Sequence, residues 1–587
     1  MANYDLDTLR HSCAHVMAQA ICELYPKDNV KLGIGPTIEH GFYYDIDMDT
    51  RLQDEDLKSI EKKMKEIIKR GDEVTRFEVS REEAVKVFAE RGQDYKLELI
   101  RDLPEGETIS YYTQGDHFID LCRGPHVETT KELNFNFKLL HTAGAYWRGD
   151  EKRPMLQRVY AACFETKEQL KEHLHFLEEA KKRDHRKLGK ELELFLFDPA
   201  APGSPFFEPK GTIVYNELIE FIRRIYRKFD YKEVITPQVL DVELWKTSGH
   251  YENYSEDMFF THDDHREMAI KPMNCPCHML MYKHKQYSYR DLPLRFADFG
   301  RLHRNERSGT LAGLTRVRTF CQDDGHIFMK QEDIQEEISR LLDMYLICYE
   351  HFGFKNIKIG LSTRPEKKVG DDKLWDKAEK ALEEALEKSG HKFHVNEGDG
   401  AFYGPKIDIQ ISDAIGRDFQ LGTVQLDFNL PERFDLKFKN TEGNEERPVV
   451  LHRALLGSLE RFFGVYLEHI AGIFPFWLAP EQVVIVPVNN EAHAEYALEV
   501  EKLLKENDIR VKCDLSNETL GKKTRTHQKA KVPFMLVLGD QEANSKTVNL
   551  RAYGSRETNE LTQKELLDKL LELQKEKTPP KLRDMNA

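Results

Sequence analysis

Two short segments near the N-terminus carry side chains that could act together in one site. His11 and His15 in HSCAH are four residues apart, a spacing that places both rings on one face of a helix. Cys122 and His126 in DLCRGPH have the same spacing. Such a set could close a tetrahedral zinc site, or could work without metal as general acids and bases beside a water molecule. Either motif alone is more often a set of unrelated side chains, but the two together favour a site.

A second group of charged residues lies in the segment 299–328. Arg304 and Glu306 are two residues apart, so on a strand they would face the same way, and Arg316 and Arg318 lie on the next strand pattern. Two guanidinium groups that reach one pocket suit a polyphosphate, because their planar fork matches phosphate oxygens. Surface ion pairing is the alternative in a chain this charged. The intervening SGTLAGLT is typical of a mobile substrate loop.

Three further metal-ligand candidates are scattered along the chain. Cys275 lies in KPMNCPCH, His326 in DDGHIF and His452 in VVLHRALLGSLERFF. Their separations match no local zinc spacing, so spacing alone predicts no metal site here.

The elements that would position these residues show clear periodicity. Apolar residues recur at helical spacing over 11–25 and 215–229, and a charged helical stretch over 167–193 is typical of a connector. Alternation of apolar and polar residues predicts antiparallel strands over 316–328 and 404–414.

One strand pattern is irregular. Over 418–428 the polar residues change parity at Gly422. A glycine at such a shift predicts a β-bulge, which would re-aim polar side chains into a pocket.

In the C-terminal region, predicted strands alternate with predicted helices. Strands at 483–488, 509–513 and 534–539 are separated by helices near 492–506 and 519–530, which predicts a small α/β domain with a largely parallel sheet.

Composition limits the possible classes of protein. The chain has 587 residues, enough for about three to five domains, and 40% hydrophobic and 32% charged residues exclude a fibrous or mostly disordered protein. Its nine cysteines are too sparse for a disulfide scaffold, and no run approaches a membrane span, so we expect a cytoplasmic protein. The net charge of −15 argues against general nucleic-acid binding but leaves local binding open.

Taken together, the motifs closely resemble those of the bacterial threonyl-tRNA synthetases, a family of class II aminoacyl-tRNA synthetases. HRNE with Arg304 resembles class II motif two, LLGSLERFF with Arg461 motif three, and YKEVITPQVL with Pro237 motif one. KPMNCP, QDDGHIF, AFYGPK, QLGTVQLDF and the HSCAH–DLCRGPH pair are specific to this family in combination. The resemblance covers essentially the whole chain.

The resemblance implies a multidomain α+β fold. Its parts would be an N-terminal α+β editing domain with a connector helix (1–182), a class II catalytic domain built on an antiparallel sheet (183–475) and a C-terminal α/β anticodon-binding domain (476–587). Relatives often carry a ubiquitin-like domain ahead of the editing domain, and we expect this chain to lack it. Cys277 stands where the family motif usually has glycine.

The resemblance also assigns the residues of the catalytic domain. The chain would join threonine to tRNA(Thr), with ATP and magnesium as substrate and one zinc ion per subunit. The implied catalytic residues are Arg304, Gln322, Lys406 and Arg461. The implied ATP-binding residues are Arg304, Glu306, Arg316, Phe320, Gln420, Thr423 and Arg461. The implied threonine-binding residues are Asp324, Tyr403, Lys406 and Gln425. The implied zinc ligands are Cys275, His326 and His452, which leave positions for the amino and hydroxyl groups of threonine.

Selectivity explains why the family has a second site. A pocket that binds the threonine hydroxyl can reject valine by ~10⁴–10⁵. Serine lacks only a methyl group, worth ~1–3 kcal/mol, which is too little discrimination. The resemblance therefore implies that the N-terminal site hydrolyses seryl-tRNA, without bound metal, through His11, His15, Lys96, Asp120, Cys122 and His126.

Further implied features concern partners. Asn517, Glu542 and Arg551 match base-reading positions of the anticodon-binding domain, and the basic run 521–531 would contact phosphates. Motif one predicts a homodimer through residues 215–240. Two rivals stay open: a prolyl-type synthetase, and a tRNA-binding deacylase or regulatory paralogue without ligase activity.

Overall fold

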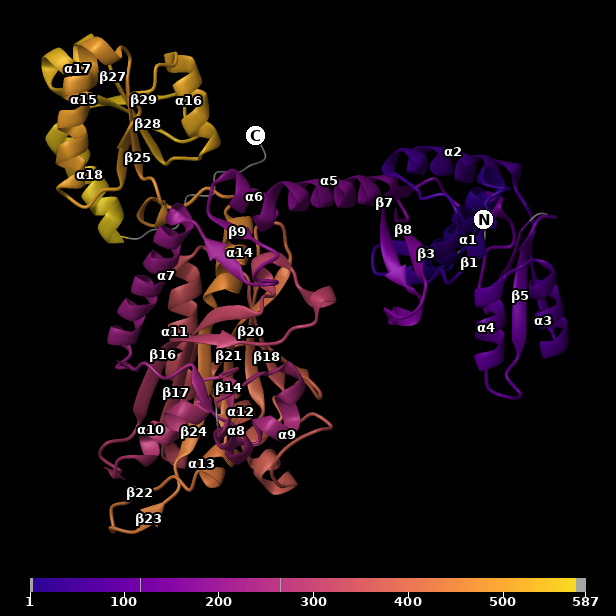
Figure 1. Cartoon of the computed structure of the whole chain (residues 1–587), viewed down its shortest axis with the longest axis horizontal. Coiled ribbons are helices and arrows are strands. Elements are labelled where there is room, and N and C mark those ends of the chain that lie inside the picture. Colours follow the sequence, from indigo (N-terminus) through magenta and orange to yellow (C-terminus); the bar gives the residue numbers. More distant parts are fainter. Residues whose placement is uncertain (1–3, 117, 264, 577–587) are drawn as a thin grey trace. The chain divides into compact units, whose positions relative to one another are not determined.

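The computed structural model describes residues 4–116, 118–263 and 265–576 (Figure 1). They divide into two compact units, Met1–Glu178 and Glu179–Ala587. Within the described residues, no helix combines the length and the apolar character that crossing a bilayer requires.

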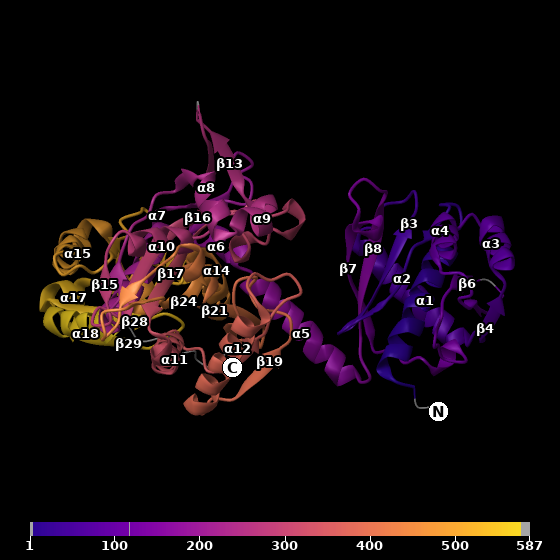
Figure 2. The same ribbon diagram turned by 90° about the horizontal axis from the view of Figure 1, so that it is seen from below.

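The first unit contains a five-stranded antiparallel sheet covered by two helices. Its path is β1-β3-β8-β7, with β2 paired to β3, and helices α1 and α2 lie against it (Figure 2). The Asp5 side chain begins α1 by accepting a hydrogen bond from the Thr8 N–H at 2.7 Å. Val16, Met17 and Ile21 then bury the apolar face that the sequence predicts. The elements are α1 (Leu6–Leu24), β1 (Lys31–Leu32), β2 (Thr37–Ile38), β3 (Gly41–Asp47), α2 (Asp54–Arg70), β7 (Phe137–Tyr146) and β8 (Met155–Cys163).

A smaller antiparallel sheet, β4-β5-β6, lies in the same unit. It packs with α3 and α4 around Ala84, Phe88, Ile100 and Ile109. Strand β6 ends just before Cys122, and α4 carries Lys96. The elements are β4 (Val74–Val79), α3 (Arg81–Glu90), α4 (Asp94–Asp102), β5 (Ile109–Gln114) and β6 (Phe118–Leu121). The predicted connector forms two helices, α5 (Lys167–Arg183) and α6 (His185–Glu191).

The second unit is built on an eight-stranded sheet in the order β11-β16-β17-β24-β21-β20-β18-β19 (Figure 1). Only the pairs at the two edges, β11–β16 and β18–β19, are parallel. The strands are β11 (Lys232–Glu233), β16 (Leu294–His303), β17 (Thr319–Met329), β18 (Ile357–Ser362), β19 (Phe393–Asn396), β20 (Lys406–Ser412), β21 (Asp418–Asp427) and β24 (Val449–Ser458).

Strand alternation divides this sheet into a core face and a site face. Ile327, Val424 and Leu451 belong to the largest hydrophobic cluster, which they share with α7 (Pro209–Lys228), α11 (Ile334–His351) and α14 (Leu459–His469). The neighbouring residues His326 and His452 therefore point to the opposite face, because side chains alternate along a strand.

The predicted β-bulge lies within one residue of Gly422. Ile409 pairs with Gly422 and Gln410 with Gln420, so Leu421 is the extra residue. A Cβ at position 422 would lie 2.4 Å from a ring carbon of Tyr345. The glycine is therefore required by close packing against α11.

The remaining elements of this part complete three small sheets and the helices around them. They are β9 (Phe195–Phe197), β10 (Pro205–Phe207), β12 (Val239–Asp241), α8 (Val242–Ser248), α9 (His250–Tyr254), β13 (Phe259–His262), β14 (Glu267–Ile270), α10 (Cys275–Lys283), β15 (Tyr287–Ser288), α12 (Asp372–Ser389), α13 (Asn429–Arg433), β22 (Phe438–Lys439) and β23 (Glu445–Glu446).

The C-terminal sheet is mixed, where the sequence predicted a largely parallel one. Strand β25 is parallel to β26 and β27, but β27-β28-β29 are antiparallel. Only the short helix α17 separates β27 from β28, and a parallel return needs about a dozen residues or more. The elements are β25 (Val483–Pro487), α15 (Asn490–Lys505), β26 (Val511–Cys513), α16 (Leu520–Lys529), β27 (Phe534–Leu538), α17 (Asp540–Ser545), β28 (Thr547–Ala552), β29 (Thr558–Thr562) and α18 (Gln563–Glu576).

Candidate functional site

The structure brings Cys275, His326 and His452 together, although spacing alone predicted no site. One potential ligand atom of each lies within 4.8 Å of the other two, and all three side chains are buried. His326 and His452 are directly opposite each other on β17 and β24, and Cys275 begins α10. A thiol and two imidazoles at this distance form a donor set that fits zinc.

Buried partners already hold one nitrogen of each imidazole. His326 Nδ1 lies 2.7 Å from His278 Nδ1, and His452 Nε2 lies 2.8 Å from Asp427 Oδ2. The nitrogens left for a metal are therefore Nε2 of His326 and Nδ1 of His452. Asp427 is itself held by the backbone N–H groups of Asn429 and Leu430.

Polar side chains surround this cluster on the site face of the sheet. Asp324 accepts a hydrogen bond from Asn274 at 3.1 Å, and burial raises the pKa of its carboxyl. The Tyr403 hydroxyl donates to Gln425 Oε1. Gln322 is half-buried on the same face, two residues before Asp324.

Asp408 joins the other polar residues of this face. It accepts hydrogen bonds from Ser362, Gln420 and Thr423, and it pairs with Lys406 Nζ at 3.0 Å. The bulge at Leu421 allows Gln420 and Thr423 to reach one carboxylate, although their numbers differ by three. This is the convergence that the parity shift predicted.

The arginine cluster lies on irregular backbone rather than on strands. Arg304 and Glu306 follow the end of β16, and Arg316 and Arg318 precede β17, so the expectation that these residues lie on strands was wrong. The short turns between the two strands (308–310 and 313–315) interrupt both patterns.

Contacts nevertheless bring these groups together. The guanidinium of Arg304 lies 5.1 Å from the centre of the Phe320 ring, and Arg316 pairs with Glu306 at 2.9 Å. Arg461 near the start of α14 donates to the carbonyl oxygens of Thr315 and Gln420. Burial and the charge of Arg316 lower the pKa of Arg461. An anion bound here would therefore stabilise the charged form of Arg461, which burial and Arg316 disfavour.

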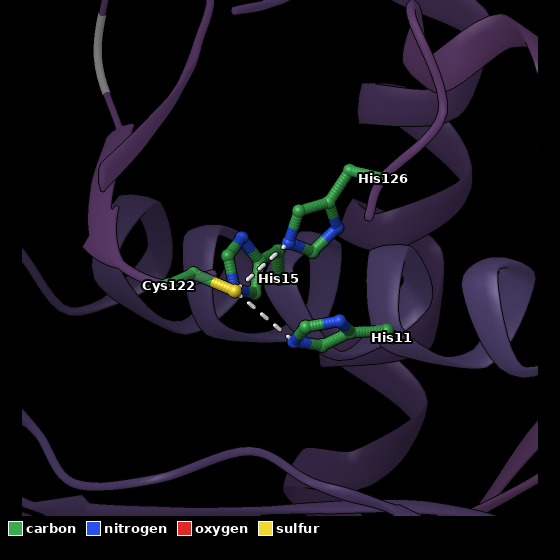
Figure 3. A group of neighbouring side chains, drawn as sticks. All are labelled: His11, His15, Cys122 and His126. Atoms are coloured by element: carbon green, nitrogen blue, oxygen red, sulfur yellow. Dashed lines mark hydrogen bonds between the residues drawn. The ribbon is translucent and has the colours of Figure 1, made fainter. Parts of the chain in front are cut away.

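The N-terminal residues form a separate cluster in the first unit (Figure 3). The Cys122 sulfur lies 3.2 Å from His11 Nε2 and 3.3 Å from His126 Nε2. His15 completes the group, with its ring centre 4.1 Å from that of His126. Helix α1 supplies two of the rings, and the segment after β6 supplies the thiol and the third ring.

Lys96 and Asp120 adjoin this cluster in a buried network. Lys96 Nζ lies 2.6 Å from Asp120 Oδ1, and His15 Nε2 lies 3.3 Å from Asp120 Oδ2. Tyr44, which sequence reasoning missed, donates to Asp120 and accepts from Lys96.

Burial sets the charge state of the N-terminal cluster. It lowers the pKa of His11, His15 and His126, and it raises the pKa of Cys122 to about 11. The three imidazoles and the thiol are therefore neutral at pH 7. Neutral imidazoles beside a buried carboxylate can act as general bases toward water.

The three base-reading candidates all lie in the C-terminal domain. Asn517 is exposed in the loop before α16, Glu542 closes the first turn of α17 by accepting from the Gly539 N–H, and Arg551 Nε donates to the Ser555 carbonyl. In the basic run, Lys523 is buried against Asn490 and Asp514, and Lys531 binds the Ala471 carbonyl. Its exposed cations are Lys522, Arg525 and Lys529.

Several polar residues that line the sites escaped sequence reasoning. They are Tyr44, His250, Asn274, His278, Asp408 and Asp427. The sequence could have indicated His278, Asp408 and Asp427, since each lies two or three residues from a predicted site residue on the same helix or strand. His250 lies 3.8 Å from Cys275 Sγ, and burial lowers its pKa to about 3.

Comparison with known proteins assigns each part to a family. The tRNA synthetase class II core domain (G, H, P, S and T) matches residues 254–470, and an anticodon binding domain matches 482–573. The threonyl and alanyl tRNA synthetase second additional domain matches 109–160. A threonine–tRNA ligase from Bdellovibrio bacteriovorus is 52% identical over 95% of this chain and 85% of its own length. The chain belongs to the threonine–tRNA ligase family.

Other members of the threonine–tRNA ligase family are similarly close to this chain. The protein from Thermotoga maritima is 50% identical over 96% of this chain and 87% of its own length. The RNA binding domain of a threonyl-tRNA synthetase from Cryptosporidium parvum matches with a TM-score of 0.65 and 47% identity, over 66% of this chain and 98% of that chain.

These matches confirm the three domain types implied by the resemblance, and they support aminoacylation and editing. None of them supports the prolyl-type or non-ligase alternatives. The boundaries at 182/183 and 475/476 stay predictions.

Proposed function

We propose that this threonine–tRNA ligase activates threonine beside Cys275, His326 and His452 and binds ATP beside Arg304 and Arg461. One observation carries the proposal: His326 and His452 lie on one face of the sheet beside Cys275, which begins α10, and strands β16 and β17 lead directly into the arginine segments. The arginine side chains thus lie next to the polar side chains around the possible metal ligands.

The chemistry follows from this arrangement. A carboxylate oxygen of threonine attacks the α-phosphorus of magnesium–ATP, the new oxygen–phosphorus bond forms, and pyrophosphate leaves. A ribose hydroxyl at the 3′ end of tRNA(Thr) then attacks the carbonyl carbon, and AMP leaves. Arg304 and Arg461 would neutralise charge on the phosphates, and Phe320 would stack on adenine. ATP would replace the ion pair between Arg316 and Glu306 with contacts to the nucleotide.

Zinc is the metal that best suits the buried cysteine and two histidines. When bound, it would supply a Lewis-acidic position for the amino and hydroxyl groups of threonine. Asp324 would accept a hydrogen bond from the threonine hydroxyl, and valine cannot donate that bond. Tyr403, Gln425 and Lys406 would orient the rest of the amino acid.

The N-terminal cluster is proposed to hydrolyse seryl-tRNA. His11, His15 and His126 would move protons to and from a water molecule, and Lys96 and Asp120 would orient the imidazole of His15. The neutral state of the rings supports this role.

We further propose a cytoplasmic homodimer that contacts tRNA through Asn517, Glu542 and Arg551. Exposed apolar side chains in the motif-one segment support the dimer. Ile235 is 90% exposed and Val239 is 47% exposed. Their burial against a second copy would remove apolar surface from water.

The test is amino-acid-dependent ATP–pyrophosphate exchange, with the zinc content measured on the same protein. We expect strong exchange with threonine, weak exchange with serine and negligible exchange with valine, at about one zinc per chain. Exchange that proline drives, or a folded zinc-loaded protein without exchange, would contradict the proposal.

A further inference from the structure

The His185 side chain lies where three segments of the second unit meet. It is the first residue of α6, directly after the N-cap residue Asp184, and it is 5% exposed. Its Nδ1 lies 2.6 Å from Glu468 Oε1 on α14. Its Nε2 accepts a hydrogen bond from the backbone N–H of Leu314 at 2.9 Å. The ring therefore joins the end of the connector, α14 and the loop between β16 and β17.

These two contacts define one tautomer of the ring. A backbone N–H can only donate, so Nε2 is unprotonated and Nδ1 carries the hydrogen that Glu468 accepts. Burial alone would favour a neutral Glu468, but the hydrogen bonds from His185 and the charge of Arg417 hold the pKa of its carboxyl below the ordinary value. The ring is thus oriented from one side and acts as an acceptor on the other.

The loop approaches the ring too closely for a side chain. Gly313 has φ +53°, and a Cβ there would lie 2.2 Å from His185 Nε2. On the far side, α14 also comes close, since a Cβ at Gly464 would lie 3.1 Å from Leu314 Cβ. Leu314 itself is fully buried. The last turn of the loop is therefore clamped between α6 and α14.

The clamped turn leads directly to the arginine cluster. The carbonyl of Thr315, next to Leu314, accepts a hydrogen bond from Arg461 Nη1 at 3.0 Å. The following residue, Arg316, pairs with Glu306. A displacement of Leu314 would move both an acceptor of Arg461 and the backbone of Arg316.

We propose that His185 is a positioning residue of the ATP site, which holds the end of the loop 308–315 through the Leu314 N–H. The inference rests on the proposed function, because it assigns Arg316 and Arg461 to ATP. Arg183, at the end of α5, donates to the His469 carbonyl at 3.1 Å, so the connector is attached at the C-terminal end of α14 as well.

The test compares two variants that each keep one half of the ring's bonding. His185→Gln can place an amide oxygen near the Nε2 position and still accept from Leu314. His185→Asn can donate to Glu468 but leaves the buried Leu314 N–H without its acceptor. In ATP–pyrophosphate exchange we expect His185→Asn to raise the KM for ATP about 10-fold, and His185→Gln to stay within about 3-fold of wild type. The KM for threonine and seryl-tRNA hydrolysis should not change in either variant.

His394→Asn, the same substitution at an exposed histidine on β19, is the matched control. If His185→Asn fails to fold, Gly313→Ala tests the same contact from the loop side, and it should raise the KM for ATP selectively. Equal effects of the Gln and Asn variants, or equal changes in the KM values for ATP and threonine, would overturn the inference alone. A wild-type protein without threonine-dependent exchange would overturn the proposed function and this inference together.

Discussion

At the scale of single residues, the orientation of the metal-ligand candidates depends on their buried partners. Asp427 Oδ2 accepts from His452 Nε2, and its Oδ1 accepts from two backbone N–H groups. Asp427→Asn can keep the backbone contacts but presents an NH₂ group to His452. We expect it to weaken zinc binding about 10–100-fold, because the partner of a ligating histidine controls its tautomer and basicity.

The measurement is zinc affinity by competition with a chelator, together with the absorption spectrum of the cobalt-substituted protein. Asp435→Asn is the control, since Asp435 is exposed beyond α13. Equal affinity in Asp427→Asn and wild type would show that His452 needs no such partner.

At the scale of elements, helix α1 determines the protonation of the N-terminal cluster. It is buried from Ser12 to Ile21, and burial lowers the pKa of both His11 and His15. A histidine with a lowered pKa keeps its neutral form to a pH below the ordinary value of about 6.5. We therefore expect the rate of seryl-tRNA hydrolysis to persist as the pH falls from 8 to about 6.

The check is a single-turnover pH–rate profile from which spontaneous hydrolysis is subtracted. A loss of rate with a midpoint near the ordinary histidine value of about 6.5 would mean that the rings are solvated in the working enzyme.

The same lowered pKa values mean that the unfolded chain binds more protons than the folded one below that pH. Stability of this unit should therefore fall as the solution is acidified.

At the scale of the whole molecule, the proposed activities belong to parts of the chain that have separate hydrophobic cores. The clusters around Leu341, Val16 and Val500 belong to the catalytic, N-terminal and C-terminal parts. Arg551→Ala should therefore raise the KM for tRNA about 10-fold in aminoacylation, the usual value of a lost base contact, and leave pyrophosphate exchange unchanged. Lys502→Ala, which removes one exposed charge from α15 of the same domain, is the control. Equal losses in both assays would mean that Arg551 acts through folding.

Much of this architecture could be predicted from the printed residues, because it depends on local periodicity. The alternation at Ile407, Ile409 and Ile411 predicted β20, and the parity shift at Gly422 predicted the bulge to within one residue. The pairs His11–His15 and Cys122–His126 pointed to a site because the two residues of each pair are only four positions apart in the sequence.

Other features were decided only when the chain folded. Cys275, His326 and His452 showed no spacing rule, and they meet because β17 and β24 pair in a register that places the two histidines opposite each other. The mixed C-terminal sheet and the irregular backbone at Arg304 depended on short connections that strand patterns do not encode. His185 had no visible role in the sequence, since its partners Leu314 and Glu468 are more than a hundred residues away. Sheet register and helix packing bring together residues that are distant along the chain. Local sequence periodicity does not predict those contacts.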